Sequence, residues 1–107
     1  MPITRPFKEL VVERIQREPE FAKALLEEAA FLMCNNEPET ARLVLRDLVN
    51  GTIGFEKLAS LTSKPSKSLH RMLSVKGNPT MENLNAILTV LCQHLDVNIE
   101  VRAVSSN

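Results

Sequence analysis

The sequence has little of what a β-rich domain needs. It contains no tryptophan, no tyrosine and only three glycines in 107 residues, a composition that argues against a turn-rich, all-β fold. Its 44% hydrophobic and 24% charged residues are ordinary for a globular protein. A chain of this length buries roughly two thirds of its unfolded surface, which is enough for a core without disulfides or metals. We therefore expect one mainly α-helical domain over residues 1–107.

Potential metal ligands and catalytic groups are scarce as well. Cys34 and Cys92 are the only cysteines, and neither has a second cysteine or a histidine at metal-ligand spacing. We expect both to be buried structural thiols, and we expect His94 at the surface near a helix end. The sequence shows no nucleophile and base in an enzyme-like arrangement and no phosphate-binding glycine loop. No catalytic residue, metal or cofactor is therefore predicted.

Long hydrophobic runs are absent too. No stretch reaches the roughly 18 apolar residues that cross a membrane. The first twenty residues carry Arg5, Lys8, Arg14 and Arg17 among acidic residues, without a continuous apolar segment. We expect neither a signal peptide nor a membrane partner, and a cytoplasmic location.

The sequence also lacks net charge, but this total hides an uneven distribution. Residues 52–78 hold five basic side chains and one acidic one, for a charge of +4, whereas residues 1–51 and residues 79–107 each carry −2. A solvated surface is the simplest explanation of such a cluster. Its position on a pair of short helices favours a binding face instead.

Hydrophobic residues at helical spacing predict helices over most of the chain. Residues 1–51 are expected to form an N-terminal helical extension with helices near 7–18, 19–33 and 36–51. Pro19 suits a first helical turn, and Asn36 with Glu39 resembles a capping box. Phe7, Leu10, Val11 and Ile15 are expected to face the core. A final helix capped by Thr80 has the most regular stripe, and we expect the core to centre on it: Met81, Leu84, Ile87, Leu88, Leu91 and Leu95.

Residues 52–96 are expected to form a helix-turn-helix core. "GFEKLASLT" predicts a helix over 54–62, a turn follows at 63–65, and "SKSLHRMLS" predicts a second helix over 66–74. Two helices of this length joined by three residues are typical of helix-turn-helix geometry. The second helix is expected to bury Leu69, Met72 and Leu73.

The outward face of this second helix carries donors and small hydroxyls that suit the major groove of DNA. If its apolar residues are buried, the 100-degree helical step turns the polar ones outward, and Arg or Lys can then donate to guanine. Lys64 and Lys76 flank this face at phosphate reach, and Asn78 offers a neutral hydrogen bond. His70 is expected to be an exposed donor or a partly packed ring. The predicted DNA-binding residues are Lys64, Ser66, Lys67, Ser68, His70, Arg71, Ser74, Lys76 and Asn78.

The C-terminal segment has a different period. In "VNIEVRAV", Val97, Ile99 and Val101 alternate with polar residues, which predicts a half-buried strand over 97–104. A lone strand leaves its backbone donors and acceptors unpaired, so the same strand of a second copy, or an edge strand of another protein, is expected to complete it.

Three segments resemble a known family. "GFEKLA", "PSKSLHRMLS" and "KGNPTMENLNAIL" are similar to the lambda-repressor-like, Cro-type helix-turn-helix domain in the form found in bacterial addiction-module antidotes, the HigA-type antitoxins. The resemblance spans about residues 19–103. It implies a dimeric DNA-binding transcriptional regulator that also neutralises a small toxin. It further implies that the recognition helix starts at Ser66 and Lys67, that Arg71 faces a base and that Ser74 contacts the DNA backbone.

The sequence departs from the family pattern at three positions. Ser63 stands where the turn usually has a glycine, so it must adopt a left-handed backbone or reshape the turn. Lys64 replaces an apolar residue, and Phe55 occupies the place of a phosphate-binding glutamine in the wider superfamily. The leading hypothesis is a regulator that binds operator DNA as a dimer. The alternative is a protein-interaction module, an antitoxin that covers a toxin and binds DNA weakly or not at all.

Overall fold

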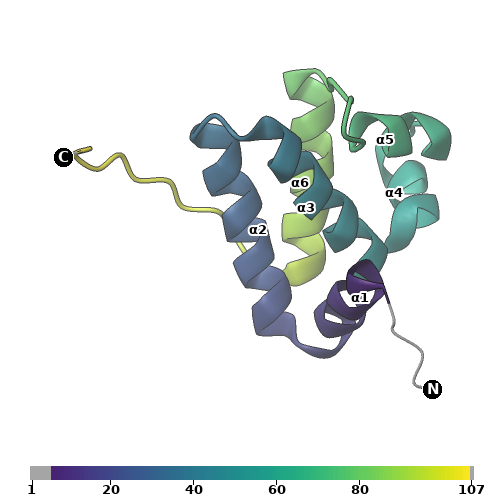
Figure 1. Cartoon of the computed structure of the whole chain (residues 1–107). Helices are drawn as coiled ribbons and strands as arrows, with labels where there is room; N and C mark the ends of the chain where they lie inside the picture. The colour runs from purple at the N-terminus through teal and green to yellow at the C-terminus, as the bar shows by residue number, and fades with distance from the viewer. Residues whose placement is uncertain (1–5, 107) are drawn as a thin grey trace.

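The structure, a computed structural model, describes residues 6–106. That range is mainly α-helical, as predicted, and Figure 1 shows the helices packed around one another with the C-terminal segment leading away past α2. The helices are α1 (Phe7–Arg17), α2 (Pro19–Cys34), α3 (Pro38–Gly51), α4 (Gly54–Thr62), α5 (Ser66–Met72) and α6 (Met81–Leu95). None of the helices within residues 6–106 combines the length and apolar character needed to cross a membrane.

The core contains buried side chains from all six helices, and its centre is α3 rather than α6. The helix α3 contributes Ala41, Leu45, Leu48 and Val49, each almost completely buried. The more regular stripe of α6 contributes Ile87, Val90 and Leu91. A regular stripe shows which side of a helix is apolar, but the number of neighbours around the helix decides how much of it is covered. Because α3 packs against α1, α2 and α4, it is the more enclosed helix.

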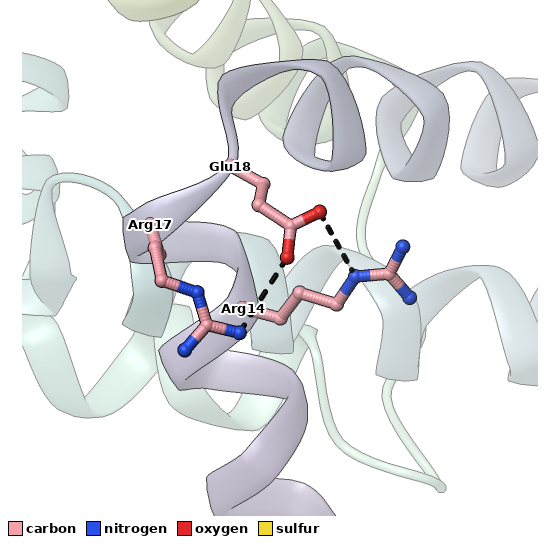
Figure 2. A network of polar contacts seen from close by, with 3 residues as sticks. All are labelled: Arg14, Arg17 and Glu18. Carbon is pink, nitrogen blue, oxygen red and sulfur yellow. Dashed lines mark hydrogen bonds and ion pairs between the residues drawn. The ribbon is translucent and has the colours of Figure 1, made fainter.

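The corner between α1 and α2 is held by a small charged cluster (Figure 2). Glu18, the residue between the two helices, accepts hydrogen bonds from Arg14 at 3.3 Å and from Arg17 at 3.5 Å. The Arg14 guanidinium also lies 4.0 Å from the centre of the Phe21 ring. The arginine and glutamate side chains are largely solvent-exposed, so each ion pair contributes at most about 1 kcal/mol. Of these contacts, only the one between Arg14 and Phe21 joins α1 to α2.

Two predicted helix starts are confirmed and one is wrong. Pro19 is the first residue of α2, and the Thr80 hydroxyl accepts a hydrogen bond from the Asn83 N–H at 3.1 Å. The capping box at Asn36 does not form. Asn36 has φ 65°, and the following Glu37 N–H donates to the Leu32 carbonyl at 2.9 Å. Asn36 therefore ends α2 in a Schellman motif, and it does not begin α3.

Several apolar residues predicted to be buried are exposed. Cys34, at the last position of α2, is exposed, whereas Cys92 is half-buried. Burial raises the pKa of the Cys92 thiol. Met81 is 86% exposed and Phe7 80%. Both are the first residues of their helices, and a terminal turn extends past the neighbouring elements that cover the middle of the helix.

The C-terminal strand predicted over 97–104 is not present in the described part of the chain. Val97 and Ile99 are partly buried and pack against the core, whereas Val101 is 75% exposed. The Val97 N–H still bonds to the Cys92 carbonyl at 3.0 Å, but no backbone hydrogen bond follows in residues 98–106. The alternating pattern correctly indicated that Val97 and Ile99 face inward. A strand, however, requires a neighbouring strand to pair with, and residues 6–106 offer none.

Candidate nucleic-acid interface

The turn between α4 and α5 is built on Ser63. This residue has φ 56° and ψ 37°, the left-handed conformation that glycine adopts most easily, and the Lys64 N–H donates to the Ala59 carbonyl at 3.2 Å. The turn thus keeps the geometry of a glycine-containing helix end although glycine is absent. A non-glycine residue in this conformation costs roughly 1–2 kcal/mol. Of the two possibilities, Ser63 accepts the left-handed backbone.

The helix α5 has one buried side and one exposed side. Leu69 and Leu73 have no exposed surface, and Met72 packs partly against the same core. The opposite side carries Lys67, His70 and Arg71, all exposed. The predicted orientation of these side chains is therefore confirmed. We call Lys67, His70 and Arg71 the α5 face.

The serines of α5 lie at the edges of this face. Ser66 and Ser68 are half-exposed. Ser74 lies beyond the helix, which ends at Met72, and its hydroxyl donates to the Arg71 carbonyl at 2.7 Å. Ser74 was expected to contact the DNA backbone, but its side-chain proton already has an acceptor within the protein. Its remaining capacity is that of a hydrogen-bond acceptor, which does not suit a phosphate.

The flanking residues differ in accessibility. Lys76 and Asn78 are exposed in the segment after α5, whereas Lys64 in the turn is half-buried. Within residues 6–106, Lys67, Arg71 and Lys76 form no ion pair. These three side chains are therefore free of direct ion pairs with acidic residues of the described chain.

Arg42, on α3, holds the segment after α5 in place. Its Nε donates to the Ser74 carbonyl at 3.0 Å and its Nη2 to the Val75 carbonyl at 2.7 Å. No sequence pattern singled out Arg42 as part of this site. The two partners are more than thirty positions away along the chain, and no local pattern connects an arginine on one helix with the backbone of a distant turn.

Gly77 lets the segment after α5 pass close to the end of that helix. It is buried, and its N–H donates to the Ser74 carbonyl at 3.1 Å. A Cβ atom at this position would lie 2.6 Å from the Arg71 carbonyl oxygen and closer still to that of Met72. Only glycine lets the chain pass so near the end of α5, so Gly77 and Arg42 together fix the backbone that carries Lys76.

Phe55 contacts the α5 face from α4. Its ring and the His70 imidazole are stacked, with centroids 3.8 Å apart and planes inclined by 20°. Phe55 is only 6% exposed, and its phenyl ring has no hydrogen-bond donor to offer a phosphate. Of the two alternatives for His70, the structure combines both, since the residue is exposed and one face of its ring is packed.

Comparison with protein-family models, with curated proteins and with solved structures finds no match for this chain.

Proposed function

We propose that the protein is a sequence-specific DNA-binding transcriptional regulator of the antitoxin-like kind, and that it binds operator DNA as a dimer through α5. The observation that carries the proposal is the α5 face, which gathers a lysine, a histidine and an arginine opposite buried Leu69 and Leu73. The α4–α5 pair would then act as a helix-turn-helix, with α5 as the recognition helix. This agrees with the family resemblance of the same segments.

Each part of the surface has its own role in this proposal. A helix of seven residues is about 10 Å long and has about two turns, so only the few side chains on its exposed side can reach the bases in the major groove. Arg71 and Lys67 can donate to the O6 and N7 atoms of guanine, and Ser66 and Ser68 can bond to several bases. Lys64, Lys76 and Asn78 border this surface and would contact phosphates, which position the protein without recognising sequence.

The test is fluorescence anisotropy of the protein on DNA from upstream of its own gene and on a scrambled duplex, at two salt concentrations. The upstream duplex should bind more tightly, with affinity that falls steeply with salt because bound phosphates release counterions. Lys67→Ala and Arg71→Ala should each weaken upstream binding by about 5- to 100-fold and reduce the preference for it. Equal binding of the two duplexes would contradict sequence-specific recognition.

Two further variants act as controls in the same titration. Lys76→Ala should weaken binding to both duplexes about equally and lower the salt slope by about 1. Lys23→Ala removes an exposed lysine of α2, a helix that Figure 1 shows away from α5, and should leave both affinities unchanged. If Lys23→Ala weakened binding as much as Arg71→Ala, the contact would be a general charge effect.

A groove beside α2 favours the second candidate function, a module that binds another protein. It has a volume of about 600 Å³ and lies between α2 and residues 98–102. Phe31, which lines it, is 59% exposed. A small toxin encoded by the neighbouring gene would be the partner. Co-purification of the two proteins, lost in Phe31→Ser but kept in Arg71→Ala, would support this function, whereas loss in neither variant would place the contact elsewhere.

A further inference from the structure

The buried ring of Phe55 stacks on the exposed imidazole ring of His70. Phe55 belongs to the buried hydrophobic core and is only 6% exposed. His70 lies at the surface of α5. The planes are inclined by only 20° at a centroid distance of 3.8 Å, so one whole face of the imidazole is covered. The orientation of an otherwise exposed histidine is thereby set by a buried residue of the preceding helix.

This contact limits what the imidazole can do. An exposed histidine usually exchanges among several side-chain rotamers, and an aromatic pair of this kind favours the stacked one by roughly 2- to 12-fold. An imidazole forms hydrogen bonds in the plane of its ring, through the edge where the two nitrogen atoms lie. A neutral imidazole offers one N–H donor and one acceptor there. Lys67 lies one helical turn before His70, so the two side chains share one side of α5.

We propose that His70 donates a hydrogen bond to N7 of a purine in the major groove, and that Phe55 is a positioning residue that orients the imidazole for this contact. The proposal rests on the DNA-binding function given above. N7 is the acceptor that guanine and adenine both present in the major groove, and a single N–H suits a single acceptor. Phe55 would thus contribute to recognition without touching the DNA.

The experiment begins with a duplex selected from a random library by the wild-type protein. Each purine of the selected site is then replaced, one at a time, by its 7-deaza analogue, which pairs normally but lacks N7. At the purine that His70 contacts, the wild-type affinity should fall by roughly 3- to 10-fold, and any guanine contacted by Arg71 or Lys67 through N7 should respond as well. His70→Ala should bind the unmodified site more weakly and should not distinguish the 7-deaza base from the natural one at that position.

Two variants separate positioning from direct contact. His70→Phe keeps a ring against Phe55 but has no donor, so it should lose the response to 7-deaza substitution as completely as His70→Ala. Phe55→Leu keeps an apolar side chain in the core but removes the stacking partner, so the response at the same position should become smaller. The NMR signals of the His70 ring protons should also shift downfield in Phe55→Leu, because the ring current of Phe55 is lost.

The outcomes are distinct. If Phe55→Leu lowers the melting temperature but leaves the 7-deaza response intact, Phe55 is a core residue only and the positioning role is overturned. If His70→Ala retains every wild-type 7-deaza response, the contact by His70 is overturned, and this result does not depend on how well Phe55→Leu folds. If the wild-type protein selects no sequence from the library, the proposed function itself fails, and the inference fails with it.

Discussion

Ser63 has a left-handed backbone conformation, which is unfavourable for residues other than glycine. Its left-handed backbone, φ 56°, favours glycine, so Ser63→Gly should raise the free energy of unfolding by about 0.5–1 kcal/mol. Urea denaturation would measure the difference. Ser60→Gly is the matched control, because Ser60 lies exposed within α4 and glycine in a helix costs about 0.5–1 kcal/mol. The same substitution should therefore have opposite effects three residues apart, and a loss of stability in both would contradict the assigned turn.

The Asp47 carboxylate is partly buried, where a negative charge is unfavourable. Its Oδ1 is buried without a hydrogen-bond partner, and burial raises the pKa of this carboxyl above its ordinary value, although the nearby Arg46 and Lys8 oppose the effect. The folded state therefore binds a proton more tightly than the unfolded state. At a pH below the ordinary aspartate pKa, Asp47 is neutral in both states and the folded state keeps its full stability. This stability is lost as the pH rises through the raised pKa that Asp47 has in the folded state.

Asp47→Asn should accordingly make the protein more stable at pH 7, with an advantage that shrinks as the pH falls to the ordinary aspartate value of about 4. Urea denaturation across this pH range would measure it. Glu28→Gln, which changes an exposed carboxylate of α2, serves as the comparison for a general change of charge. If the Asp47→Asn variant were less stable than the wild type at pH 7, attraction by Arg46 and Lys8 would outweigh burial.

Among the elements, α3 has a second role besides forming the centre of the core. Through Arg42 it holds the carbonyls of Ser74 and Val75 and so connects the N-terminal helices to the end of α5. Arg42→Ala should cost about 1–3 kcal/mol, because two charge-assisted hydrogen bonds are lost. It should also speed amide exchange in residues 74–77.

The same variant should weaken binding to specific and scrambled duplexes alike, because the backbone that carries Lys76 loses its support. Arg42→Lys is the informative control. It keeps the charge but cannot reach both carbonyls with a planar fork, so it should restore little of the lost amide protection. Full restoration by lysine would mean that charge, and not geometry, holds the segment.

At the scale of the whole molecule, the C-terminal segment suggests how two copies would meet. Val97 and Ile99 are anchored on the core while Val101 is exposed, and the backbone beyond Val97 makes no backbone hydrogen bonds within residues 98–106. If two such segments pair antiparallel about Val101, Glu100 of one copy lies opposite Arg102 of the other. The segment is then self-complementary in both charge and apolar side chains.

Light scattering on charge variants tests this arrangement. In the proposed dimer, Glu100→Arg should weaken association because it places like charges opposite one another, and the double variant Glu100→Arg with Arg102→Glu should restore association. Deletion of residues 100–107 should give a monomer while leaving the anchored Val97 and Ile99 in place. A dimer that survives the deletion would show that the copies associate through another surface.

The exposed direction of α5 follows from the sequence itself. Leu69 and Leu73 lie one helical turn apart, and this local spacing already turns Lys67, His70 and Arg71 outward. The positions of the helix ends, and the burial of residues near them, were harder to predict from local spacing. Asn36 suits the start of one helix as well as the end of another, and Cys34 and Met81 fit an apolar stripe but lie where no neighbour covers them.

The sequence by itself determined the mainly helical fold, the order of the helices and the basic surface around α5, because each depends on residues within one or two helical turns of one another. The tertiary structure decided the placement of α3 at the centre, the support of Ser74 and Val75 by Arg42, the stacking of Phe55 on His70, and the lack of a pairing strand for residues 97–104 within the described chain. These features depend on contacts between different elements. Their geometry is set by how the helices pack together, and no local periodicity encodes it.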